Sequence, residues 1–169
     1  MTTDLLSSHL SEAAIVQNES LGAFVLWKFG LAFQDPDGYP ATLPLVFLIL
    51  PLVLHGPTLS VVLATQKISG FHLFVGKLGE KREDLLAVHG RAMALRHLTL
   101  ESLMLGERSG LFRIEPSGAK LWSNGLSEGL RVPILPERVR RIVPACERLG
   151  YWFSGVPDQQ VVHSLRVEF

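Results

Sequence analysis

The 169-residue sequence has little cysteine and little charge. Its single cysteine, Cys146, excludes an internal disulfide and any zinc site built from cysteine pairs. Charged residues make up 19% of the chain, below the roughly 25% that is usual for soluble domains, and 16 basic residues balance 16 acidic ones. A zero net charge argues against a strongly basic protein that coats nucleic acid. It also provides little repulsion against association, so the composition favours a chain that binds other proteins.

Motifs of catalysis and cofactor binding are also missing. The sequence contains no phosphate-binding loop, dinucleotide fingerprint, zinc-protease motif or calcium loop. Its six histidines fall in separate segments or on different helix faces, so we expect no metal and no cofactor. Residues 125–129 fit the G-x-S-x-G pattern of serine hydrolases, with Ser127 followed by Asp158 and His163. That pattern requires a strand before the serine and a helix after it, which this loop lacks. A small hydrolase is therefore the least favoured alternative, and we expect no enzymatic activity.

No hydrophobic run is long enough to cross a membrane as one helix. The most apolar segment, 43–54, has twelve residues and two prolines, whereas a spanning helix needs about 20 residues. The run 21–33 is apolar on every side except at Lys28, as in a helix that is buried all round. Both runs predict buried helices. The first residues lack the positive charge of a secretion signal, so we expect a cytoplasmic protein.

The remaining patterns predict a mainly α fold with a small antiparallel β-hairpin sheet. A hairpin is predicted near 111–122, and the alternating residues 165–169 predict a C-terminal strand that pairs with it. A short helix (69–78) and a long helix (81–105) precede the hairpin, an order that resembles a winged helix. A further helix is predicted from Pro136 to Leu149. We therefore expect one winged-helix-like domain over 18–169, preceded by a flexible segment, 1–17.

The long predicted helix has two distinct faces when it is drawn at 100° per residue. The predicted core face holds Leu85, Ala92, Met93, Leu100, Leu103 and Met104. The opposite face holds Glu83, Ala87, Gly90, Ala94, His97 and Glu101. The side chains in the middle of this face are small, so it is either a contact for another helix or a solvated surface.

Two polar residues fall on the core face of this helix. A buried guanidinium needs a carboxylate partner, so Arg96 is predicted to pair with an acid such as Glu19 or to point into an interface. His89 is predicted to be a hydrogen-bonded histidine in or beside the core.

A cluster of arginines raises the alternative of DNA binding. Arg131, Arg138, Arg140 and Arg141, with Arg148 further on, form either a patch for DNA or a partner, or simply the solvated side of their helix. Acidic residues on the helix that would enter the groove, Glu83, Asp84 and Glu101, disfavour direct contact with bases. A DNA-binding winged-helix protein is the first alternative.

Five stretches of the sequence resemble the small middle component of three-component ABC-ATPase conflict systems, a group that includes the small subunit of Lamassu-type antiphage defence. The stretches are NESLGAFVLWKF (18–29), LPLVFLILPLVLH (43–55), HGRAMALRHLTLESL (89–103), GLFRIEPSGAKL (110–121) and LRVEF (165–169).

This resemblance implies a non-catalytic adaptor subunit of a bacterial antiphage defence complex. The implied partners are an SMC-like ABC ATPase and an effector, often a nuclease, with DNA contacted through the complex. The residues of the matching stretches that the resemblance implies as partner-binding or structural anchors are Trp27, Arg96 and Glu101.

Overall fold

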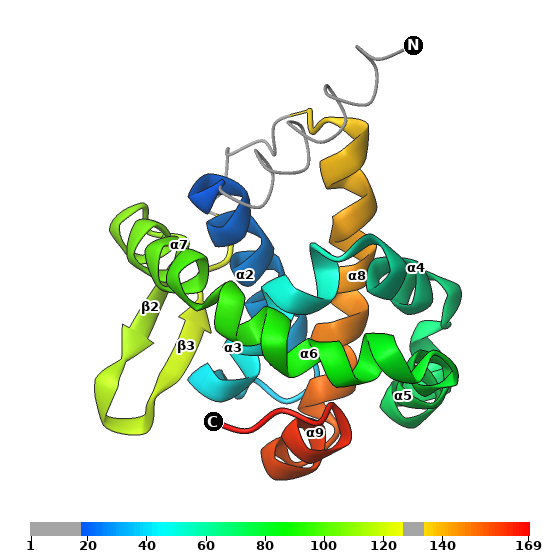
Figure 1. Ribbon diagram of the computed structural model, residues 1–169. Coiled ribbons are helices and arrows are strands. Elements are labelled where there is room, and N and C mark those ends of the chain that lie inside the picture. The colour runs from blue at the N-terminus through cyan, green and yellow to red at the C-terminus, as the bar shows by residue number, and fades with distance from the viewer. Residues whose placement is uncertain (1–17, 127–133) are drawn as a thin grey trace, which may run out of the picture.

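The computed structural model describes residues 18–126 and 134–169 and shows a mainly helical fold with a small antiparallel sheet (Figure 1). This confirms the fold class that the sequence predicts. The predicted flexible segment 1–17 lies outside the described residues. The helices are α2 (Glu19–Gln34), α3 (Leu43–Val53), α4 (Gly56–Ala64), α5 (Gly70–Glu80), α6 (Arg82–Ala94), α7 (Arg96–Arg108), α8 (Glu137–Ser154) and α9 (Asp158–Ser164), with short 3-10 turns at Lys67–Ser69 and Pro116–Gly118.

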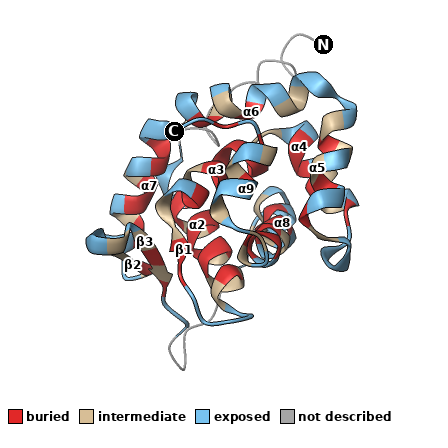
Figure 2. Ribbon diagram, turned by 90° about the horizontal axis from the view of Figure 1, so that it is seen from below, coloured by how far each residue is buried: buried red, intermediate tan, exposed pale blue. Residues whose placement is uncertain are grey.

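Helices α2 and α3 are buried, as their continuous apolar runs predict. The side chain of Asn18 caps α2 by accepting a hydrogen bond from the Leu21 N–H at 3.0 Å. Helix α2 packs most extensively against α8 and α7, and Figure 2 shows buried residues along α2, α3 and α8. Eight of the eleven residues of α3 are buried inside the fold. An apolar run with this environment is a core helix.

No helix in the described ranges is by itself long and apolar enough to span a membrane. Helices α3 and α4 satisfy the length and composition requirement only when taken together, and they are bent by 102° relative to each other.

The sheet contains the predicted hairpin but not the predicted third strand. Strands β2 (Phe112–Glu115) and β3 (Lys120–Ser123) pair antiparallel, with Ile114 opposite Leu121. The third strand is β1 (Ala41–Thr42), which pairs with the other edge of β3 and gives the order β1-β3-β2.

The prediction of a C-terminal strand at 165–169 is wrong. Arg166 has a φ of 58°, and the Val167 N–H donates to the Val162 carbonyl, so the chain folds back onto α9. Leu165 and Val167 are buried, while Arg166 and Glu168 are exposed. The alternating pattern therefore reflects a tail packed on the core rather than a strand.

The prediction of one continuous helix over 81–105 is also wrong. The chain breaks at Leu95 (φ −94°, ψ 4°), which ends α6 and begins α7. A helical wheel assumes one unbroken axis, so part of its predicted core face fails on both sides of the break, although Ala92 and Leu103 are buried as predicted. Met93 is 51% exposed and Met104 is 62% exposed, whereas Val88 and Leu98 are buried.

Helix α8 extends five residues beyond the predicted end at Leu149. Gly150 does not stop this helix but allows it to approach α2 closely. A Cβ atom added at Gly150 would lie 2.8 Å from both the Phe29 carbonyl oxygen and the Phe33 nitrogen, and 2.6 Å from the Ala32 Cβ. Only a glycine fits this contact between the two helices.

Candidate partner-binding surface

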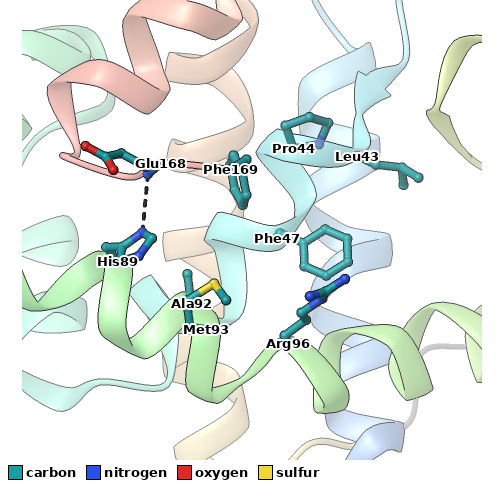
Figure 3. A pocket seen from close by; sticks show the side chains of 9 residues that line it. All are labelled: Leu43, Pro44, Phe47, His89, Ala92, Met93, Arg96, Glu168 and Phe169. Atoms are coloured by element: carbon teal, nitrogen blue, oxygen red, sulfur yellow. Dashed lines mark hydrogen bonds between the residues drawn. The ribbon is translucent and has the colours of Figure 1, made fainter.

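An apolar groove lies between the start of α3, the end of α6 and the C-terminal residues (Figure 3). Its volume is about 420 Å³. Six of its nine lining residues are apolar and three are polar, a composition suited to binding an apolar partner surface. The lining residues are Leu43, Pro44, Phe47, His89, Ala92, Met93, Arg96, Glu168 and Phe169.

Arg96 lies at the rim of this groove and not in the core. It is the first residue of α7 and is exposed, and it forms no ion pair within the described ranges. Glu19 is exposed at the start of α2 and is not its partner. The prediction that Arg96 is buried and paired with an acid is therefore wrong, because the break at Leu95 turns this position outward. The alternative, that Arg96 points into an interface, stays a prediction. Figure 3 shows its guanidinium beside the Phe47 ring.

His89 connects α6 to the C-terminal residues. Its Nδ1 accepts a hydrogen bond from the Glu168 N–H at 3.2 Å, and the residue is half-buried. This confirms the predicted hydrogen-bonded histidine at the edge of the core. The contact holds the tail across the groove, where Phe169 is 67% exposed.

The small residues of α6 continue the groove as an exposed surface. Ala87, Gly90 and Ala94 are exposed, and a Cβ atom added at Gly90 would meet no atom within 4 Å. Leu86 and Met93, on the same helix, are also exposed. We call these five residues the α6 face. No described residue covers it, so both interpretations of the small stripe, helix contact and solvated surface, are compatible with the structure.

The polar anchor inside the fold is Arg91, which sequence reasoning missed. Its guanidinium donates to the Pro51 carbonyl (3.3 Å), to the Thr58 Oγ1 (3.1 Å) and to the Asp84 carbonyl (3.3 Å). These bonds join α6 to α3 and α4. Burial lowers the pKa of Arg91, and the negative charge of Asp84 opposes that shift. Two of its three acceptors, on α3 and α4, come from distant parts of the chain, so no local spacing could have indicated the role.

His55 belongs to the same polar cluster. Its Nδ1 lies 2.8 Å from the Thr58 Oγ1, which already accepts from Arg91 and is free to donate its own proton to the ring. Burial, and after it the charge of Arg91, lower the pKa of His55 from its usual 6.5, while Asp84 acts in the opposite direction. The cluster therefore favours a neutral imidazole.

Trp27 and Glu101 do not line the groove. Trp27 is buried in α2, where its Nε1–H donates to the Asn124 carbonyl at 2.7 Å and its own carbonyl accepts from the Ser123 hydroxyl at 3.0 Å. It thus ties the end of the hairpin to α2. Glu101 lies on α7, where its carboxylate is 3.0 Å from the His97 Nε2.

The predicted basic patch is only partly within the described residues. Arg138, Arg140 and Arg141 are exposed in the first turns of α8, and Arg140 forms an ion pair with Glu137. Arg138 and Arg141 line a second depression, of about 610 Å³, beside the junction of α3 and α4. Arg131 lies outside the described residues.

Arg148 is not part of that exposed patch. Its guanidinium donates to the Val62 carbonyl at 3.1 Å and to the Leu63 carbonyl. Both carbonyls lie in the last turn of α4, where that of Val62 also accepts from the Thr65 N–H at 3.2 Å. Arg148 therefore fastens α8 to α4.

The residues considered for catalysis or metal binding are not assembled into a site within the described ranges. Ser127 lies outside them, and the Asp158 carboxylate accepts a hydrogen bond from the Thr42 hydroxyl. Cys146 is fully buried, and this burial is the main reason that its pKa is raised to about 12. No group of three or more His, Cys, Asp or Glu side chains there could hold a metal ion.

The helical fold and its open apolar groove define a small α+β protein with a surface suited to contact with another protein. The chain belongs to the family described as ABC-three component (ABC-3C) system Middle Component 3, whose model matches residues 6–169. This confirms the family to which the sequence showed a resemblance. Comparison with curated proteins gave no match, and neither did comparison with solved structures.

Proposed function

We propose that this chain is a non-catalytic adaptor that joins an SMC-like ABC ATPase to an effector, often a nuclease, in a cytoplasmic antiphage defence complex of the Lamassu type. Membership of a middle-component family supports a role within a multi-component system. The observation that carries the proposal is the apolar groove with the adjoining α6 face, which the described chain leaves uncovered.

Burial of this surface by a partner would contribute a few kcal/mol to a complex. Leu86 is 53% exposed, and Met93 and Phe169 are also more than half exposed. Full burial of such side chains contributes about 1.5–3 kcal/mol each relative to full exposure. These residues are already half covered, so a partner gains about half of that per side chain. Methionine also adapts to partner surfaces of varied shape.

The decisive experiment is co-purification with the neighbouring components. The chain is expressed with the ATPase and effector encoded beside it, and the tagged ATPase is isolated in the presence and absence of this chain. If this chain is an adaptor, the effector should be recovered with the ATPase only when this chain is present. Equal recovery of the effector without this chain would refute the adaptor role.

A gel-shift assay with the isolated chain tests the alternative function, direct DNA binding. If the isolated chain binds duplex DNA directly, a gel shift should weaken steeply with salt, because phosphate contacts release counterions. The Arg141→Glu variant should then abolish the shift, since Arg141 is exposed at the start of α8. In the adaptor proposal, the isolated chain gives no shift at physiological salt and DNA binding requires the ATPase.

A further inference from the structure

We propose that the groove binds a helix of another component of the complex, with apolar side chains of that helix in the groove and one of its carboxylates against Arg96. This inference rests on the proposed adaptor function and adds the chemistry of the partner. It names a structural class of partner segment, an amphipathic helix with an acidic residue at the edge of its apolar face.

The walls of the groove have the geometry of a helix-binding site. Leu43, Pro44 and Phe47 line it from the first turns of α3, and Ala92 and Met93 line it from the last turn of α6. Figure 3 shows the positions of these side chains on the two helices. An amphipathic helix places apolar side chains at positions i, i+3 or i+4, and i+7 into such a groove.

The surface next to the groove favours a helix over a small molecule. Ala87, Gly90 and Ala94 are spaced three and four residues apart along α6 and carry little or no side chain. Small residues at this spacing allow the backbone of a second helix to approach closely. The groove is open to solvent at Met93 and Phe169, whereas a small ligand is usually bound in a pocket that encloses most of its surface.

Arg96 determines the charge of the partner. It is exposed at the groove rim and forms no ion pair with a described residue. The Glu168 carboxylate is directed away from it in Figure 3. A purely apolar partner would bury part of this guanidinium without compensation, which is unfavourable. A carboxylate from the partner satisfies it, and the planar guanidinium holds a carboxylate through two hydrogen bonds.

The first test uses charge reversal in the full complex. Arg96→Glu and Met93→Asp should each weaken binding of the partner component at least about tenfold, the effect expected for a central interface residue. Arg96→Lys should retain more affinity than Arg96→Glu. The matched controls are Arg108→Glu, also exposed on α7, and Ile68→Asp, exposed outside the groove. Both controls should change the affinity less than about twofold, as at surface positions outside an interface.

All four positions are exposed, so the variants should keep the circular dichroism spectrum of the parent chain. If the parent complex forms and neither Arg96→Glu nor Met93→Asp weakens it, the groove proposal is refuted and the adaptor role stands. If the parent chain forms no complex at all, both proposals fail.

The second test identifies the occupant directly. A photo-crosslinking amino acid at position 93 is activated in the assembled complex, and the crosslinked peptide is sequenced by mass spectrometry. The expected peptide comes from another component, is helical and contains Asp or Glu, and reversal of that acid to Arg should restore binding to Arg96→Glu. A crosslink within this chain, to a second copy of it or to DNA would overturn the proposal.

Discussion

Replacing glycine by alanine should have opposite effects at two helical positions of this protein. At Gly150 the added Cβ would lie 2.8 Å or less from two backbone atoms and the Ala32 Cβ of α2. Forcing extra atoms into a packed site costs about 1–3 kcal/mol, and contact with backbone places this site at the upper end. The better helix propensity of alanine offsets about 1 kcal/mol of that cost. Gly150→Ala should therefore lower the free energy of unfolding by about 2 kcal/mol.

Gly90→Ala provides the matched control. The same methyl group there meets no atom within 4 Å, so only the propensity gain of about 1 kcal/mol remains. The two variants should therefore differ by about 3 kcal/mol, more than about a hundredfold in the unfolding equilibrium. For a chain of this size, their melting temperatures should differ by about 6–12 °C.

Urea unfolding followed by circular dichroism measures both free energies. A second variant, Ala32→Gly combined with Gly150→Ala, removes one of the three close contacts but leaves the two to backbone. Ala32→Gly alone costs about 1 kcal/mol of helix propensity, so the double variant should lose less free energy of unfolding than the two single variants lose in sum. If Gly150→Ala and Gly90→Ala stabilise the protein equally, α2 and α8 are further apart than the structure shows and the reasoning is refuted.

Two further predictions concern the polar cluster and the rim arginine. Arg91→Ala should lower the free energy of unfolding by about 2 kcal/mol, because it removes a half-buried donor to three acceptors. Arg96→Ala should change it by no more than about 0.5 kcal/mol. Equal losses for the two variants in urea unfolding would contradict this prediction. The lowered pKa of His55 means that the folded protein resists its protonation. The stability that the neutral His55 ring contributes should be fully present above pH 6.5 and should be lost as the pH falls through the lowered pKa of the folded state. His55→Gln should weaken this acid sensitivity in unfolding measurements at pH 7.5 and 5, and an unchanged pH profile would exclude His55 as its source.

Long apolar runs and turn residues were the features that sequence reasoning interpreted correctly. The run around Trp27 and the run that contains Pro51 could only be stable as buried helices, and both are. The hairpin followed from its alternating strands and its Pro-Ser-Gly turn. These signals are local, so they do not depend on how distant segments pack.

The errors arose where distant packing decides the outcome. Leu95 interrupts the helix without a glycine or proline, so nothing local predicted the break, and the core face assigned from one continuous wheel was displaced at Met93, Leu100 and Met104. The same displacement moved Arg96 from the core to the rim and hid the role of Arg91. The two-residue strand Ala41–Thr42 is too short to produce an alternating sequence pattern. It forms only by hydrogen bonding to the edge of β3.

The pairing of α2 with α8 has a consequence for how the protein is made. Helix α2 ends at Gln34 and its most extensive partner begins at Glu137, roughly 100 residues later. At synthesis rates of about 5–20 residues per second, that interval lasts about 5–20 s. During this time the apolar surfaces of α2 and α3 have left the ribosome before the segment that covers them. A nascent chain that stalls before α8 is therefore a natural substrate for chaperones and proteases.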